Sequence, residues 1–166
     1  MQAVRVVLKV RTVQAGVGKL VTLAKRPKKS HSAGSLTSGV VSPSVASRRR
    51  ARIIALVESL PGASAIDLGV GHLSLEVRGR RFGYYLYDHH GDGRTAINCK
   101  AEPGANKSLA DFGPDRFHIP AYLGSRGWIG LWIDLPRVNW DEIESVIVDA
   151  YRLTAPKQLL ARLRHR

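Results

Sequence analysis

Aromatic and basic side chains alternate through the middle of this sequence in a pattern that suits contact with a nucleic acid. Tyr85 and Tyr87 lie in one short apolar segment, Lys100 ends a second, and Trp128 and Trp132 lie in a third. If these segments form neighbouring strands, their rings can share one sheet face and stack on unpaired bases, at roughly 1–3 kcal/mol per base. The competing expectation is burial of at least two of the four rings, the usual position of large aromatic side chains. We select Tyr85, Lys100 and Trp132 as candidate contacts.

A second group of basic residues surrounds a predicted hairpin turn. Arg78, Arg80 and Arg81 flank Gly79, and Arg126 comes shortly before the segment that contains the tryptophans. Guanidinium groups bind phosphates in a bidentate manner, so these four arginines are further candidate contacts. The alternative is a solvated turn, which is the commoner role of such residues.

Few residues are suited to catalysis or metal binding. Cys99 is the one cysteine, and its place in an apolar alternation favours a small buried side chain over a nucleophile, which needs a base and partial exposure. His89, His90 and Asp92 lie in a glycine-rich turn without the spacing of a known metal site. We therefore expect no enzymatic activity, no cofactor and no metal.

The periodicity of apolar residues predicts the elements that position these side chains. Ser47 can cap a first helix, which Pro61 and Gly62 end. Alternation then predicts a three-stranded antiparallel meander over 73–77, 82–87 and 95–100. Its inner face is expected to carry Leu73, Leu75, Val77, Phe82, Tyr84, Leu86, Thr95, Ile97 and Cys99, and its outer face Tyr85, Tyr87, Asn98 and Lys100.

The second half of the chain adds helices to this sheet. Asn139 and Glu142 have the spacing of a capping box at the start of a helix, and Pro156 breaks that helix or begins a final one. The other predicted elements are a short helix over 105–112, an extended segment over 117–120 and a strand over 128–134. The fold class is therefore α+β, with an antiparallel sheet of about four to five strands and helices packed on one face.

Charge is distributed very unevenly along the 166 residues. The sequence has 26 Lys and Arg against 13 Asp and Glu; residues 1–57 carry 12 of the basic residues and no acidic one, and residues 58–166 carry 14 against 13. The pI of 10.6 therefore does not by itself indicate nucleic-acid binding. We expect residues 1–46 to be a disordered basic tail, a transit peptide or a stretch before the true start, and residues 47–166 to form one domain.

Four of these basic residues lie at the start of the first predicted helix, where they oppose the helix dipole: Arg48, Arg49, Arg50 and Arg52. They indicate either a solvated helix face or an acidic partner. The single cysteine suits a reducing compartment, and no apolar run approaches the roughly 18–20 residues that span a bilayer. We expect a cytoplasmic protein without membrane contact.

Several motifs occur in a specific order: Ser59-Leu60-Pro61-Gly62, Gly71-His72, Val77-Arg78-Gly79 before Phe82, Asp115-Arg116-Phe117, Tyr122, Gly127-Trp128-Ile129-Gly130, Val138-Asn139-Trp140-Asp141-Glu142 and Ala150-Tyr151-Arg152-Leu153-Thr154-Ala155-Pro156-Lys157. This order resembles the MmcQ/YjbR family of small bacterial proteins over about residues 48–163. The resemblance implies a fold described as a double-wing DNA-binding motif, with DNA as the partner. The family often has Pro-His-Tyr where this chain has Pro120-Ala121-Tyr122, so a role of that histidine is not carried over.

Together these features predict a non-enzymatic DNA-binding protein that uses an outer sheet face and the hairpin at Arg78–Arg81. The alternative is a module that binds a protein or a small molecule on the same face and has no nucleic-acid role. A continuous positive stripe favours DNA, whereas a charge-balanced rim around Trp128 and Trp132 favours the alternative.

Overall fold

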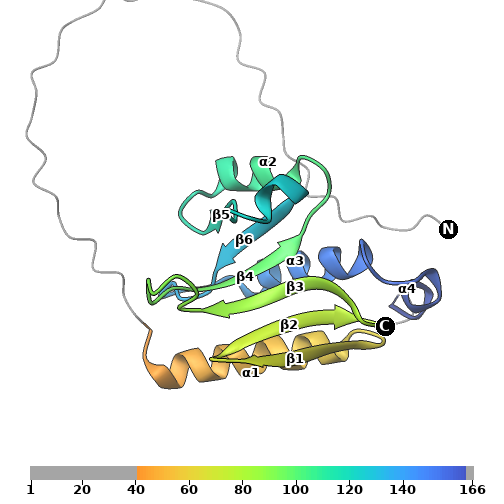
Figure 1. The fold of residues 1–166 in the computed structure, drawn as a ribbon, viewed down its shortest axis with the longest axis horizontal. Coiled ribbons are helices and arrows are strands. Elements are labelled where there is room, and N and C mark those ends of the chain that lie inside the picture. The colour runs from red at the N-terminus through yellow and green to blue at the C-terminus, as the bar shows by residue number, and fades with distance from the viewer. Residues whose placement is uncertain (1–40, 164–166) are drawn as a thin grey trace, which may run out of the picture. The chain divides into compact units, whose positions relative to one another are not determined.

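The computed structural model describes residues 41–163 (Figure 1). The expectations for residues 1–40, which make up most of the predicted tail, lie outside the described residues. The elements of the described part are, in order, α1 (Pro43–Ser59), β1 (Ala63–Gly69), β2 (His72–Val77), β3 (Arg80–Tyr87), β4 (Thr95–Lys100), α2 (Ala105–Phe112), β5 (Phe117–His118), the 3-10 helix η1 (Gly124–Arg126), β6 (Trp128–Trp132), α3 (Trp140–Arg152) and α4 (Lys157–Leu163).

The six strands of the described part form one antiparallel sheet in the order β1-β2-β3-β4-β6-β5. The predicted α+β class with an antiparallel sheet is confirmed. The periodicity did not predict β1, because its larger apolar side chains are exposed: Ile66 is 43% exposed and Leu68 is 50% exposed. Since alternation reports burial of one face, a strand that buries only Ala63 and Ala65 in part carries little signal.

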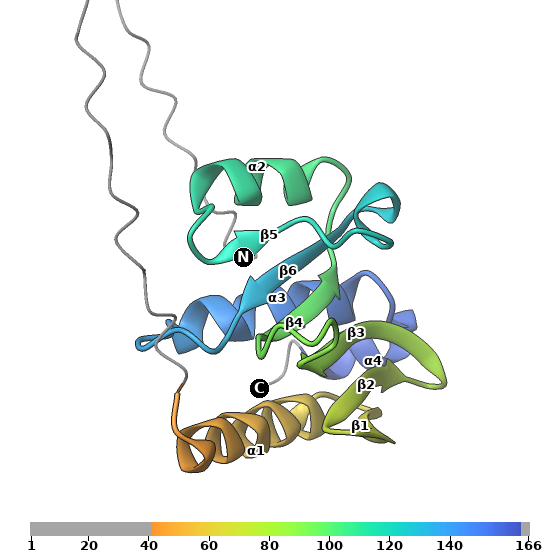
Figure 2. The same cartoon turned by 60° about the vertical axis from the view of Figure 1, so that its left-hand side comes forward.

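The hydrophobic core lies between the sheet and three helices. Ile53 of α1, Ile147 of α3 and Leu159 of α4 are buried in one cluster with inward-facing strand residues such as Leu75. Figure 2 shows α1 beneath β1 and β2, with α3 behind β4 and β6. Each such side chain contributes about 1.5–3 kcal/mol when it is fully buried. The prediction that helices pack on one sheet face is therefore confirmed.

A β-bulge in β3 changes which of its side chains face the core. Gly83 and Arg81 pair with neighbouring residues of β2, so Phe82 is an extra residue without a partner. The alternation after the bulge is shifted by one position. Tyr85 consequently lies on the inner face and is 2% exposed, whereas Tyr84 lies on the outer face. The predicted facing of these two tyrosines was wrong, because a strict period of two does not anticipate an inserted residue.

The start of α1 and one contact at the start of α3 differ from the prediction. α1 begins at Pro43, about one turn before the predicted cap Ser47. α3 has the predicted N-cap, since the side chain of Asn139 accepts hydrogen bonds from two backbone amides. Glu142 does not complete the capping box; its carboxylate accepts a bond from Arg116 instead, at 3.0 Å.

Within residues 41–163, no helix combines the length and the apolar composition that a membrane span requires.

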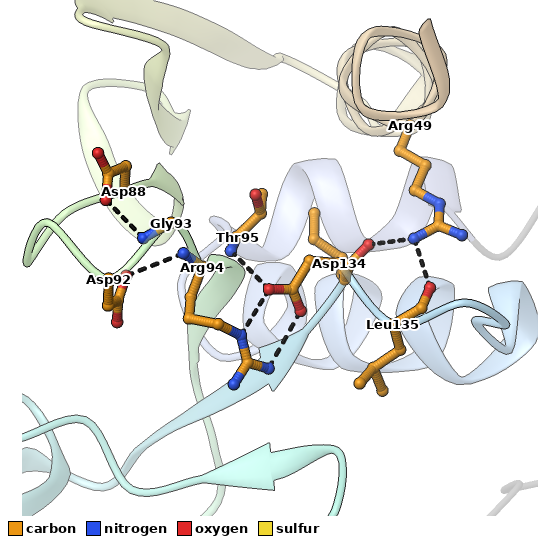
Figure 3. Close-up of polar contacts among 9 residues, drawn as sticks. Arg49, Asp88, Asp92, Gly93, Arg94, Thr95, Asp134 and Leu135 are labelled. Atoms are coloured by element: carbon orange, nitrogen blue, oxygen red, sulfur yellow. Dashed lines mark hydrogen bonds and ion pairs between the residues drawn. The ribbon is translucent and has the colours of Figure 1, made fainter. Parts of the chain in front are cut away.

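The arginines of α1 make contacts within the domain. Arg49 donates to two backbone carbonyl oxygens in the β6–α3 connection, at 2.6 and 2.7 Å (Figure 3). Arg50 forms an ion pair with Asp67 at 2.7 Å. The guanidinium carbon of Arg52 lies 4.1 Å from the centre of the Trp140 ring. These three residues therefore join α1 to the sheet and to α3, and the acidic partner considered above is not needed to explain them.

Candidate nucleic-acid interface at one end of the sheet

The strand order gathers several of the predicted basic contacts at one end of the sheet. Because neighbouring strands are antiparallel, β2 and β4 end where β3 and β6 begin. The β2–β3 turn, the end of β4 and the start of β6 are therefore at the same end (Figure 1). These segments carry Arg78 and Arg80, Lys100 and Arg126, respectively. With two residues of α4 they form a group that we call the basic end: Arg78, Arg80, Lys100, Arg126, Lys157 and Arg162.

Helix α4 brings Lys157 and Arg162 to this end of the sheet. Gly62 lies just before β1, and both α4 and the β2–β3 turn approach it. A Cβ atom at Gly62 would lie 3.0 Å from Cδ1 of Leu159 in α4 and 3.8 Å from Nε of Arg78 in the turn. The sequence pattern did not indicate these two residues as contacts. The order of the elements could have indicated the position of Lys157 and Arg162. β6 finishes at the opposite end of the sheet, α3 returns the chain to the end where β1 begins, and α4 follows α3 directly.

The basic end differs in its charge pairing from the opposite end of the sheet. Within residues 41–163, none of its six cations forms an ion pair with a carboxylate. At the opposite end three arginines have acidic partners, Arg50 with Asp67, Arg94 with Asp134, and Arg116 with Glu142, whereas Arg48 and Arg137 have none among residues 41–163. Within the described residues, the basic end therefore offers cations that no carboxylate already holds, as contacts to a polyanion require.

Lys100 and Arg80 lie close enough to influence each other. The pKa of the Lys100 amine is lowered, first by burial and then by the positive charge of Arg80. The Nζ atom lies 3.4 Å from the hydroxyl of Thr154, which follows α3. An anion placed between Lys100 and Arg80 would reduce their repulsion and raise this pKa again.

Arg81, the third arginine of the hairpin, is held on the outer sheet face. Its Nε atom donates to the hydroxyl of Ser74 at 2.7 Å, and its terminal amine contacts Glu76 at 3.3 Å. The guanidinium also lies over the ring of Tyr84, 4.7 Å from its centre, and donates to its hydroxyl. Arg81 lies at the same end of the sheet, but its side chain is already engaged and its charge is partly balanced by Glu76, so we do not count it in the basic end.

The aromatic rings of the predicted sheet face are largely occupied by other parts of the domain. Tyr85 lies in the core, and Trp128 is only 7% exposed, so the expected burial of at least two rings is confirmed. The indole of Trp132 is stacked on the imidazole of His118, with ring centres 3.9 Å apart, and the Arg94 guanidinium lies over it at 3.9 Å. The open stacking surface that we predicted from Tyr85 and Trp132 is therefore not formed.

The structure also places the residues that we considered for catalysis. Cys99 is completely buried, and its burial raises the pKa of the thiol to about 12. A thiol with this pKa is neutral at physiological pH and is a poor nucleophile. His89 and His90 are exposed in the β3–β4 turn. In the described part of the chain, no three His, Cys, Asp or Glu side chains are grouped as metal ligands would be.

Comparison with known proteins places this fold in a family. The YjbR family model matches residues 58–153, which include all six strands of the sheet. This chain belongs to the YjbR family. The family match thus confirms the resemblance stated from the motifs. Among curated proteins, none matches the sequence significantly.

Two solved structures are similar to this YjbR-family chain. One is a Deinococcus radiodurans protein with the family-model domain DUF419, at 16% identity and a TM-score of 0.50, covering 61% of this chain and 74% of that one. The other is a Pseudomonas syringae protein, at 15% identity and a TM-score of 0.52, covering 64% of this chain and 98% of that one. At these identities the likeness shows the shared fold alone.

Proposed function

We propose that this YjbR-family protein binds DNA, and that the basic end supplies the contacts to phosphate groups. The observation that carries the proposal is that six cations, none of which has a carboxylate partner among residues 41–163, gather at one end of the sheet. Exposed arginines and lysines with no internal partner can exchange their water for phosphate oxygens, whereas paired ones must first break an ion pair.

Charge polarisation matters here because the folded part has little net charge. Residues 41–163 carry 16 basic residues against 13 acidic ones. Sequence-independent affinity for DNA comes mainly from neutralising phosphates and releasing counterions. A near-neutral domain binds in this way only if one surface is positive, and we propose the basic end as that surface.

The outer sheet face fits the alternative, a protein- or small-molecule-binding module, less well than the basic end fits DNA. Trp132 is already covered by His118 and Arg94, and Arg94 is neutralised by Asp134 at 2.5 Å. The rim of the outer sheet face is therefore balanced in charge, but the aromatic rings on this face have few open surfaces for a ligand.

The experiment is a salt titration of DNA binding by charge-neutralised variants of the full chain. We expect Arg80→Gln combined with Arg126→Gln to weaken binding to a labelled duplex in fluorescence anisotropy. Each lost phosphate contact lowers the slope of log K against log salt concentration by about 0.9, so the double variant loses nearly two units of slope.

The matched control removes two charges elsewhere on the same chain. Arg48 and Arg137 are exposed and lie outside the basic end, so Arg48→Gln with Arg137→Gln should leave the slope almost unchanged. Both double variants have the same net charge, which separates a local contact from the attraction of the whole chain. Equal slopes for the two double variants would show that the basic end is not the contact surface.

A further inference from the structure

The segment between β5 and β6 lies at the same end of the sheet as the basic residues. It runs from Ile119 to Gly127 and contains η1 and Arg126. Asn106 of α2, which is 5% exposed, donates from its side-chain amide to the carbonyl oxygen of Gly124 at 2.9 Å. The same amide lies 3.4 Å from the carbonyl oxygen of Trp128, where β6 begins. A buried side chain therefore fastens this segment to the first residue of β6.

Close packing fixes the segment further. The amide of Gly124 donates to the carbonyl of Pro120 at 2.7 Å, and the amide of Trp128 donates to that of Leu123 at 3.2 Å. A Cβ on Gly124 would stand 2.2 Å from Cγ2 of Ile119, so only glycine fits at this position. The segment therefore has a defined conformation without a ligand, which lowers the entropic cost of binding one.

Tyr122 projects from this fixed segment into solvent. It is 83% exposed, more than any other Phe, Tyr or Trp side chain among residues 41–163. Within those residues, its hydroxyl has no hydrogen-bond partner and its ring has no aromatic or guanidinium neighbour. Arg126, also exposed and without a carboxylate partner, follows four residues later. The segment thus presents a flat ring and a phosphate-binding cation together.

We infer that Tyr122 is a stacking platform for an unpaired base, and that the basic end therefore prefers single-stranded DNA to a duplex. This inference rests on the proposed function, because the neighbouring cations hold the backbone of the same strand. In a duplex the faces of internal bases are covered by their neighbours, so a tyrosine ring can stack only on a base that has left the helix. An unpaired strand offers these faces without that cost, and aromatic stacking accepts any base.

The test compares Tyr122 variants of the full chain in fluorescence anisotropy with labelled oligothymidine and with a duplex of equal length. We expect Tyr122→Ala to weaken binding of the single strand by about tenfold, because the stacking of one base on the ring is lost. Tyr122→Phe keeps the ring and should bind as the unchanged protein does. Duplex binding should be the same for all three proteins.

Two controls assign the effect to stacking at this position. Tyr87→Ala removes a ring that is 48% exposed at the opposite end of the sheet, and should not change binding. An oligonucleotide with abasic sites in place of bases keeps the phosphates. The unchanged protein should bind it about as weakly as Tyr122→Ala binds oligothymidine.

The possible failures of the two proposals are distinguishable. If Tyr122→Ala binds oligothymidine normally, while Arg80→Gln with Arg126→Gln weakens it, the stacking inference is wrong and the proposed function stands. If Tyr122→Ala weakens oligothymidine and abasic binding equally, the ring does not act by stacking and the inference is again wrong. If the arginine variants leave binding of both DNA forms unchanged, the proposed function fails and the inference fails with it.

Discussion

Individual arginines in this domain have different roles that their sequence neighbourhood does not reveal. Arg49 bonds to carbonyl oxygens 84 and 86 positions later in the chain, whereas Arg78 and Arg80 have no carboxylate partner in the described part. Both groups occur in short arginine-rich stretches of the sequence. The sequence could identify these side chains as candidate phosphate contacts, but only the fold shows which of them are already used.

His118 illustrates a residue whose protonation is coupled to folding. Its imidazole stacks on Trp132, and its Nδ1 atom is buried without a hydrogen-bond partner among the described residues. Burial lowers the pKa of His118, and the charge of Arg94 lowers it further, while Asp134 and Asp92 oppose the shift. The folded protein therefore resists taking up a proton that the unfolded chain accepts below about pH 6.5.

The free energy of unfolding should consequently decrease as the pH falls from about 7.5 to about 5.5, since the unfolded state binds more protons there. We expect the free energy of unfolding of His118→Gln, measured by urea denaturation at these two pH values, to decrease less than that of the unchanged protein. Part of the pH dependence should remain, because the pKa of His72 is also lowered, by burial and by His89. If the variant and the unchanged protein lose the same free energy, His118 is not responsible.

At the scale of elements, the apolar pattern was sufficient for most helices and strands but not for details that depend on contacts across the fold. The strands at 95–100 and 128–132 and the helix at 105–112 follow their periodicity closely. The bulge at Phe82 could not be inferred, because the residue types of β3 are the same with or without a bulge. The bulge nevertheless changes which side chains of β3 face the core and which face outward. This one shift moved Tyr85 from the predicted interface into the core.

One carboxylate adds side-chain contacts where β4 begins and β6 has just ended (Figure 3). Asp134, whose side chain is 12% exposed, accepts bonds from Arg94 at 2.5 and 3.1 Å and from the Thr95 amide at 3.2 Å. Asp134→Asn leaves the partly buried guanidinium without its counter-charge, so we expect a loss of about 2–3 kcal/mol in the free energy of unfolding.

The control for this junction is an exposed ion pair with a single contact. Asp149 and Arg152 lie 2.9 Å apart on α3, with side chains 58% and 57% exposed. Because solvent screens such pairs, Asp149→Asn should cost about 0.5 kcal/mol or less in chemical denaturation. A similar loss for both variants would mean that the Asp134 junction contributes no more than a surface pair.

At the scale of the whole molecule, the account depends on where positive charge is placed rather than on how much there is. Sequence reasoning recognised that the net charge of +13 belongs mainly to residues 1–57, and it identified four members of the basic end. It could not show that strand order and α4 bring together six cations that have no carboxylate partner among residues 41–163, since these come from segments up to 84 positions apart (Arg78 to Arg162). That convergence is a property of the fold.

The most direct test maps the DNA contact on the full chain by amide chemical-shift changes in NMR when a short duplex is added. The account predicts that the largest changes fall in the β2–β3 turn, at the end of β4, just before β6 and in α4. Changes confined to residues 1–40, or centred on the β1–β2 and β3–β4 turns at the opposite end, would contradict it.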